Sequence, residues 1–219
     1  MMADLTGIVV LMLLLVASEA RVGDSTETSF CTETKECLEY DLVCKNEEYE
    51  VRHYDSTKWV SADAQSYFME VAINRGFMKL FRYIQGANDA GVKIDMTAPV
   101  IIKTKEDRSV WQQSNYTVSF LFPSRYQNGE AIPKPTEESV YLTNMPESHV
   151  YVKSYGGWML DMTSRYYSRH LREQLDAVQA SYKKDVHYDV GYDSPMKIFN
   201  RHNEVWYIVD GKPVCPAAK

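Results

Sequence analysis

The fold is indicated by two stretches, Lys93-Ile-Asp-Met-Thr-Ala-Pro-Val100 and Gly191-Tyr-Asp-Ser-Pro-Met-Lys-Ile198, here called the first and second proline stretch. Apolar residues run through both, and a proline biases the residue before it to extended geometry, so each stretch predicts a strand. Each follows a segment with helical periodicity and precedes another predicted strand. The same order of elements is therefore predicted twice.

Two apolar stripes precede the proline stretches, both spaced four, four, three and four residues apart, which predicts one buried face on each of two helices. The stripes consist of Met69, Ile73, Phe77, Leu80 and Ile84 and of Tyr167, Leu171, Leu175, Val178 and Tyr182. Trp59 and Trp158, like Pro99 and Pro195, recur at nearly the same offset as the stripes. This agreement predicts an internal duplication.

Each half of the duplication reads as strand, strand, helix, strand, strand, over about residues 46–122 and 139–210. One half alone would leave a sheet edge and an apolar helix face exposed, whereas pairing the halves about a pseudo-two-fold axis buries both. We therefore predict one α+β domain over residues 46–210. In this prediction, eight strands form a distorted antiparallel β-barrel flanked by two helices.

The start of the chain predicts an exported protein without a stable membrane anchor. The apolar run 8–17 is too short to span a bilayer, and Ser18-Glu-Ala20 supplies the small residues of a cleavage site. We expect a signal peptide over residues 1–20 and a secreted, extracellular product. Because residues 1–6 carry Asp4 and no Lys or Arg, an uncleaved anchor or a different start stays an alternative.

Four cysteines remain after that cleavage, and an even number in a secreted chain predicts two disulfide bonds with three possible pairings. Three lie in a polar leader, residues 21–45, expected to be mobile, and the fourth lies in a short tail, residues 211–219. One bridge must therefore tie the two ends together. The cysteines are Cys31, Cys37, Cys44 and Cys215, and Cys44 with Cys215 is favoured because they flank the first and last strands.

Several classes of function are disfavoured. The net charge of -6 and the absence of a Lys/Arg run argue against nucleic-acid binding. No nucleophile elbow, zinc-protease, Walker A or dinucleotide motif occurs, so the chain is predicted not to be an enzyme. Asn115-Tyr-Thr117 is a sequon that predicts N-glycosylation of Asn115 where its side chain is exposed.

Seven short motifs together resemble the SOUL family of haem-binding proteins, over about Cys44 to Val209. They are Tyr49-Glu-Val-Arg-His-Tyr54, Lys58-Trp-Val60, Gly76-Phe-Met-Lys-Leu80, Tyr83-Ile-Gln-Gly86, the two proline stretches and Asn200-Arg-His-Asn-Glu-Val-Trp206. The resemblance implies a duplicated, distorted β-barrel with two helices, similar to effector-binding domains, and a non-covalent haem or other porphyrin ligand. The familiar members are cytosolic, so the signal peptide and cysteines of this chain depart from the pattern.

A porphyrin needs an apolar slot and cations for its propionates. The expected lining residues are Met69, Ile73, Phe77, Leu80 and Met96, with plain core packing as the alternative for each. The expected cations are Arg75, Lys79 and Arg82 on the first helix and Lys197 in the second proline stretch, with a solvated face as the alternative. Lys79 and Lys197 match the basic positions of the family best.

His53 is the candidate axial ligand of a haem iron, because the resemblance aligns it with the histidine proposed for that role in close family members. Other members bind haem without a protein ligand, and a hydrogen-bonded strand histidine is the alternative. The leading prediction is a secreted haem or porphyrin binder that serves transport, buffering or scavenging. The alternatives are a protein-interaction or apolar-ligand module without haem, and an enzyme that would need a glutamate facing the central cleft.

Overall fold

The computed structural model describes residues 21–27, 29–106 and 111–215, so the predicted signal peptide lies outside the described residues. The helices are α1 (Met69–Ile84), α2 (Ser124–Gln127) and α3 (Asp161–Ala177), with a 3-10 turn at Ser25–Glu27. The strands are β1 (Val22–Asp24), β2 (Glu36–Leu38), β3 (Asp41–Lys45), β4 (Glu50–Tyr54), β5 (Thr57–Ser66), β6 (Val100–Lys105), β7 (Ser114–Leu121), β8 (Val140–Met145), β9 (Ser148–Tyr155), β10 (Val186–Gly191) and β11 (Asn203–Ile208). Across these ranges, no helix is both long and apolar enough to cross a bilayer.

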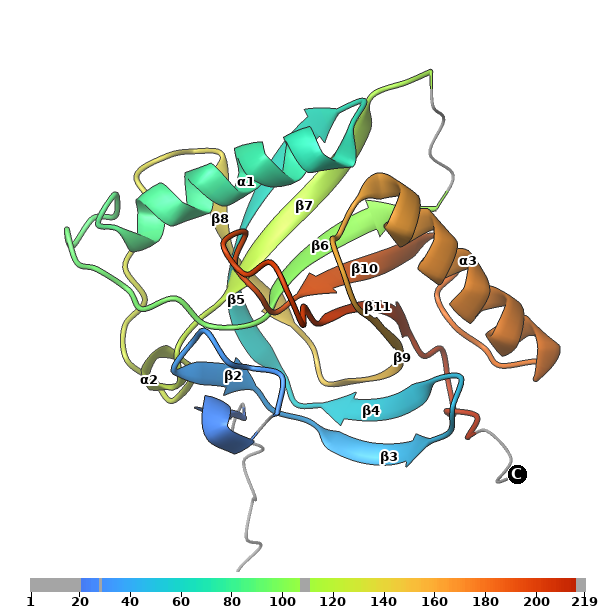
Figure 1. Ribbon diagram of the computed structural model, residues 1–219. Helices are drawn as coiled ribbons and strands as arrows, with labels where there is room; N and C mark the ends of the chain where they lie inside the picture. The colour runs from blue at the N-terminus through green and yellow to red at the C-terminus, as the bar shows by residue number, and fades with distance from the viewer. Residues whose placement is uncertain (1–20, 28, 107–110, 216–219) are drawn as a thin grey trace, which may run out of the picture.

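Nine strands form one antiparallel sheet in the order β3-β4-β9-β11-β10-β6-β7-β5-β8, and β1 and β2 form a separate pair. The two long helices lie over different parts of this sheet, α1 over β5 and β7 and α3 over β9 and β11 (Figure 1). The predicted α+β class with a large antiparallel sheet is confirmed.

The strand pairings repeat on the two sides of the central β6–β10 pair. On one side the ladders are β6–β7, β7–β5 and β5–β8, and on the other side their counterparts are β10–β11, β11–β9 and β9–β4. The antiparallel pair β6–β10 joins the halves at the centre. The ninth strand, β3, comes from the leader and extends the sheet beyond β4.

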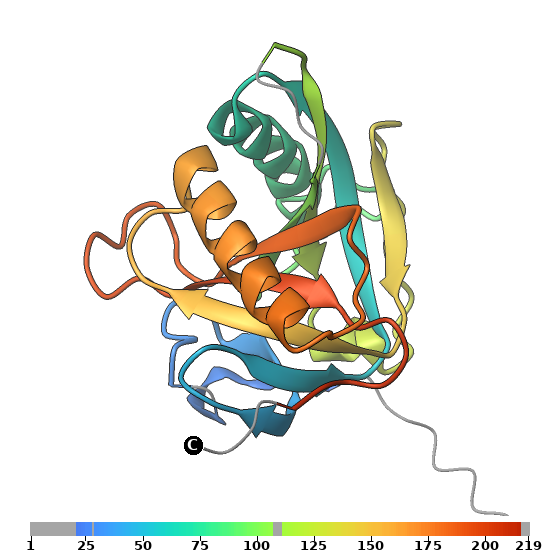
Figure 2. The same cartoon turned by 90° about the vertical axis from the view of Figure 1, so that its right-hand side faces the viewer.

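The predicted distorted eight-stranded β-barrel is not confirmed, because the sheet is not closed into a barrel across the described residues. β3 and β8 are the outer strands of the sheet, and no ladder joins them in the described part of the chain. The ladders β4–β9 and β5–β8 share one register, with Tyr54 opposite Ser148 and Thr57 opposite Met145. The segment from β4 to β5 and the segment from β8 to β9 both bend between these two residue pairs, so the sheet turns sharply there (Figure 2). The bend, rather than a closing ladder, curves the sheet around its inner face.

Each helix buries part of its predicted stripe on the outer face of the sheet. On α1, Met69, Ala72 and Leu80 pack against β5 and β7, and Gly76 makes the closest approach. A Cβ atom at Gly76 would lie 2.6 Å from Cγ2 of Val118, so the helix can lie this close only with glycine there. The second helix is shorter than its predicted stripe, because α3 ends at Ala177.

Neither proline stretch forms the predicted strand. The first is a loop that precedes β6, whereas the second starts at the last residue of β10 and continues as a turn. The two stretches are therefore not equivalent positions of the duplication. In the antiparallel β6–β10 pair, Val100 lies opposite Gly191, so the loop before one strand and the loop after the other lie at the same end.

The leader was expected to be mobile, but its described residues are docked on the domain. Cys37 and Leu38 are buried in the core between the sheet walls, and main-chain hydrogen bonds of 2.9 and 3.2 Å join Leu38 and Glu36 to Ala98. The disulfide bonds are Cys31–Cys37 and Cys44–Cys215, of which the second is the favoured pairing. Buried apolar side chains and sheet hydrogen bonds thus offset the entropy of ordering this segment.

Candidate functional site

A cavity of about 250 Å³ lies where the two proline stretches meet α1. Four segments form its walls: α1, the end of the first proline stretch, the start of the second, and the leader. The lining residues are Phe77, Phe81, Met96, Thr97, Ala98, Val100, Gly191, Tyr192, Asp193, Ser194, Pro195, Glu33 and Thr34. Packing of the whole domain therefore brings the stretches that define the family resemblance into one site.

The interior of the cavity is apolar on the α1 side. The Phe77 ring lies 6.0 Å from the ring of Phe81 and 4.9 Å from that of Phe120, centroid to centroid. Phe81 stays 38% exposed, so one side of this aromatic wall is open to ligand. Ligand pockets usually enclose about 300–1,000 Å³, so this cavity has room for the edge of a large flat ligand but not for the whole.

Exposed apolar side chains follow the last lining residue, Pro195, along the chain. Met196 and Phe199 follow the cavity wall and are 87% and 78% exposed. The neighbouring loop carries Trp158, whose ring lies 4.4 Å from the guanidinium carbon of Arg201. Scattered apolar residues on a surface are common, but a group that continues an apolar cavity is typical of a binding site.

Lys197 is held beside the cavity by the second proline stretch. Its amine donates to Asp193 Oδ1 at 2.5 Å and to Thr32 Oγ1 at 3.0 Å. The buried Asp193 carboxylate also accepts the His202 amide at 2.6 Å. The loop therefore carries its own counter-ion, and an anionic ligand would compete with Asp193 for Lys197.

The other predicted cations lie on the opposite flank of α1. Arg75 and Lys79 donate to backbone oxygens of β5 at 3.1 and 3.2 Å, and Arg82 pairs with Glu137 at 3.0 Å. They line a separate open groove of about 490 Å³. The structure thus brings Lys197, but not Arg75, Lys79 or Arg82, to the apolar cavity.

Only some of the predicted lining residues lie at the cavity. Phe77 and Met96 line the cavity, whereas Met69 and Leu80 have no exposed surface and belong to the core under α1. Ile73 is partly buried against the same core. Met69, Leu80 and Ile73 are therefore core residues, which was the alternative to a lining role.

His53 lies on β4, at the other end of the molecule from α1 (Figures 1 and 2). Its Nε2 atom is 2.9 Å from Glu147 Oε1, and its ring centroid lies 4.9 Å from that of His149. No histidine of the described chain lines the cavity. The geometry therefore agrees with the alternative for His53, a hydrogen-bonded histidine on a strand, and does not bring His53 to this site.

The family model of the SOUL heme-binding protein matches residues 35–208. The chain belongs to the SOUL heme-binding protein family. This SOUL chain is 36% identical to Heme-binding protein 2 of Homo sapiens over 165 residues, covering 75% of the chain and 80% of that relative. It is 32% identical to Heme-binding protein 1 of Mus musculus, covering 73% and 83%.

A solved structure shares the fold of this SOUL domain at low sequence identity. The EcmrR chain in an EcmrR–DNA complex superposes with a TM-score of 0.55 at 8% identity, covering 76% of the SOUL chain and 59% of EcmrR. At this identity, the likeness concerns the arrangement of strands and helices alone.

The leader residues of the cavity precede the SOUL match, which begins at residue 35. Glu33 accepts hydrogen bonds from the Ser194 amide and hydroxyl, and the Phe30 ring stacks on His202 with centroids 4.1 Å apart. Glu33, Phe81 and Tyr192 line the cavity although the sequence did not predict them as site residues. The only signal for the leader was the close spacing of Cys31 and Cys37.

A glutamate does face the inner side of the sheet, as the enzyme hypothesis required. Glu204 is fully buried and pairs with Arg52 at 3.0 Å, and Tyr192 and Trp206 donate to it at 3.1 and 2.6 Å. Burial alone would raise the pKa of Glu204, but Arg52 and the hydrogen bond from His202 outweigh it and lower the pKa to about 2. Such a paired, ionised carboxylate holds the core together and has no proton to donate.

Under α3, three side chains have the order found in serine hydrolases. Ser164 Oγ lies 3.1 Å from His187 Nε2, and His187 Nδ1 lies 2.6 Å from Glu106 Oε1. Burial would lower the pKa of His187, but Asp189 and Glu106 raise it to about 9. Because Ser164 is fully buried and the imidazole is protonated at neutral pH, this cluster anchors α3 to the sheet.

Proposed function

We propose that this SOUL protein binds haem or a related porphyrin non-covalently between α1 and the second proline stretch. The observation that carries the proposal is the apolar cavity lined by Phe77, Phe81 and Met96, with Lys197 beside it. The heme-binding names of its relatives support the ligand class. Transport, buffering or scavenging are the roles such binding would serve.

The residues suggest how a porphyrin would be held. One edge of the macrocycle would pack against Phe77 and Phe81, and the rest would cover the exposed Met196 and Phe199. A propionate would replace Asp193 as the partner of Lys197. Bound haem would supply a redox-active iron, and the protein would supply packing and charge without a histidine ligand.

A haemin titration followed by absorbance tests the ligand and its location. We expect a saturable Soret band with the wild-type chain and clearly weaker binding with Phe81→Ser. Phe68→Ser is the matched control, because Phe68 lies at the start of the same helix, is 67% exposed and does not line the cavity. His53→Ala should leave the spectrum unchanged.

Two results would count against the proposal in different ways. Equal loss in the Phe68 and Phe81 variants would place the ligand elsewhere on the protein. A wild-type titration that never saturates would remove haem as the ligand. It would favour the alternative of an apolar-ligand or protein-interaction module, for which the exposed Met196, Ile198 and Phe199 are a suitable surface.

We further propose that the protein is secreted after cleavage before Arg21. The apolar run of residues 8–17 and the two disulfide bonds support this compartment. Asn115 is exposed on β7, so a glycan has room there. Expression in secretory cells should yield a product in the medium that begins at Arg21 and loses its glycan in the Asn115→Gln variant. Retention of the full chain inside the cells would contradict this proposal.

A further inference from the structure

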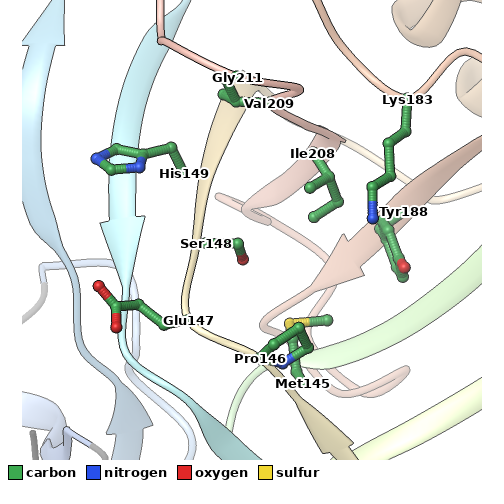
Figure 3. Close-up of a pocket in the computed structure, with 10 residues that line it drawn as sticks. All are labelled: Met145, Pro146, Glu147, Ser148, His149, Lys183, Tyr188, Ile208, Val209 and Gly211. Carbon is green, nitrogen blue, oxygen red and sulfur yellow. The ribbon is translucent and has the colours of Figure 1, made fainter.

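A second concave site lies further along the β6–β10 pair, separate from the porphyrin cavity. Two cavities of about 330 and 280 Å³ share Met145, Pro146 and Tyr188 as lining residues, so they form two parts of one cleft. Figure 3 shows the first part, where Lys183, Tyr188 and Ile208 lie on one side and His149 and Glu147 on the other. None of these residues belongs to the proposed porphyrin site.

The floor of the cleft is apolar. Trp59 and Ile101 are almost fully buried in the second part, and Ile208 lines the first part. Met145 and Pro146 contribute to both parts. This surface suits the body of an aromatic or branched ligand, because it removes apolar area from water.

Three hydrogen-bond donors of the cleft, on Lys103, Lys183 and Tyr188, have no partner among the described residues. Lys103 lies directly opposite Tyr188 in the β6–β10 ladder, and Lys183 lines the first part. Within the described ranges, neither lysine amine nor the Tyr188 hydroxyl has a hydrogen bond or ion pair. Burial, with a smaller contribution from Asp185, raises the pKa of Tyr188, so its hydroxyl stays a donor at neutral pH.

Two carboxylates near the cleft, those of Glu147 and Asp63, already have partners. Glu147 bonds His53 at 2.9 Å, and Asp63 accepts hydrogen bonds from Thr117 and Tyr141 at 2.7 and 3.0 Å. In Figure 3, the Glu147 carboxylate points away from Lys183 and Tyr188. The cleft therefore offers two unpaired cations although the chain has a net charge of -6.

A row of hydroxyl groups completes the second part. The Ser61 and Ser119 oxygens are 2.7 Å apart, and Thr143 donates to Ser61 at 2.8 Å. These hydroxyls satisfy one another and also leave acceptor capacity facing the cleft. A ligand with a polar group at one end and an apolar body matches this distribution.

We propose that the cleft binds an amphipathic organic anion, a carboxylate or sulfonate attached to an aromatic or branched apolar body. The anionic group would form ion pairs with Lys103 and Lys183 and accept a hydrogen bond from the Tyr188 hydroxyl. The body would pack against Trp59, Met145 and Pro146. This site is independent of the porphyrin site, so the inference does not rest on haem binding.

The probe is 8-anilinonaphthalene-1-sulfonate, whose fluorescence rises in apolar sites, titrated into the full mature chain. We expect saturable binding that the double variant Lys103→Gln/Lys183→Gln weakens by about fivefold or more. The control variants are Lys79→Gln, which removes a cation from another groove, and Phe81→Ser, which alters the porphyrin cavity. Both should bind the probe like the wild type, and the double variant should bind haemin like the wild type.

A matched neutral probe, N-phenyl-1-naphthylamine, separates charge from apolar packing. It should bind more weakly than the sulfonate and be insensitive to the two lysine substitutions. The proposal is wrong if Lys79→Gln weakens sulfonate binding as much as the double variant. It is equally wrong if Phe81→Ser abolishes sulfonate binding, or if the wild type gives no saturable signal.

Discussion

At the residue scale, the structure distinguishes two lysines that the sequence treats alike. Lys197 lies beside the apolar cavity and shares its hydrogen bonds with Asp193 and Thr32. Lys79 lies on the far flank of α1 and donates to the Asp63 carbonyl. If the porphyrin site is the cavity, only the first of these amines can meet a propionate.

We therefore predict that Lys197→Gln raises the Kd for haemin about three- to tenfold, because one charge-assisted contact is lost. Lys79→Gln should leave the Kd unchanged. Absorbance titrations of both variants at one ionic strength measure this difference. A weakening by Lys79→Gln alone would move the site to the groove on the other flank of α1.

His187 is a second residue whose behaviour follows from its surroundings. Its pKa is about 9 in the folded chain, against about 6.5 for histidine in an unfolded one. The folded state therefore binds the proton more tightly. The resulting stabilisation is fully present below pH 6.5, falls as the pH rises, and is lost above pH 9.

We predict that His187→Gln removes this pH dependence. Between pH 6.5 and 9.5, the wild type should lose on the order of 3 kcal/mol more unfolding free energy than the variant. Urea denaturation at both pH values measures the two differences. Parallel pH profiles for the two proteins would show that His187 does not carry a proton between Glu106 and Asp189.

At the element scale, the two disulfide bonds have different consequences. Cys44–Cys215 ties β3 to the segment after β11 and spans a sequence separation of 171, whereas Cys31–Cys37 spans 6. The loss of chain entropy in the unfolded state grows with the length of the closed loop. The longer bridge should therefore contribute more to stability, even though the shorter one adjoins the cavity wall.

We predict that Cys44→Ala/Cys215→Ala lowers the unfolding free energy by about 5 kcal/mol, and Cys31→Ala/Cys37→Ala by about 2 kcal/mol. Urea denaturation of both double variants under non-reducing conditions gives the comparison. The reverse order would mean that contacts of the leader, rather than chain entropy, dominate the effect.

At the scale of the whole molecule, the halves of the duplication depend on each other. The ladders β4–β9, β5–β8 and β6–β10 each pair a strand of one half with a strand of the other. A separate half would expose all these edges and part of the core. We therefore expect the domain to unfold as one cooperative unit.

We predict that residues 46–122 and residues 139–210, expressed separately, each lack a cooperative unfolding transition. Circular dichroism during urea titration measures this, with the full mature chain as the control. A sigmoidal transition in either half alone would contradict the prediction, since that half would then be stable without its partner ladders.

Much of the fold was predictable because it depends on local patterns. The stripe from Met69 to Ile84 predicted the buried face of α1, and the cores confirm it. The proline stretches were misread as equivalent strands, because apolar loops and buried strands have the same short-range composition. Their spatial meeting follows from the antiparallel β6–β10 pairing, which no local pattern contains.

The candidate site was predictable only in part. Helical spacing already separates Arg75, Lys79 and Arg82 from Phe77 and Phe81 on opposite flanks of α1. Tertiary packing decides what each flank of α1 contacts. The flank with the three cations lies against β5, and the flank with the two phenylalanines lies against the proline stretches. The family resemblance brought His53 into the predicted site, and it gave no signal for the leader residues, which precede the SOUL match.

By itself, the sequence determined the α+β class, the order of the strands and long helices within residues 46–210 and membership of the SOUL family, because periodicity and motif spacing are properties of the chain. Tertiary structure alone decided that the sheet bends instead of closing and that the leader docks on the cavity. It also decided which cation stands beside the aromatic wall. These features arise from contacts between residues far apart in sequence. Local sequence patterns are compatible with several such arrangements, and burial and strand register determine which one forms.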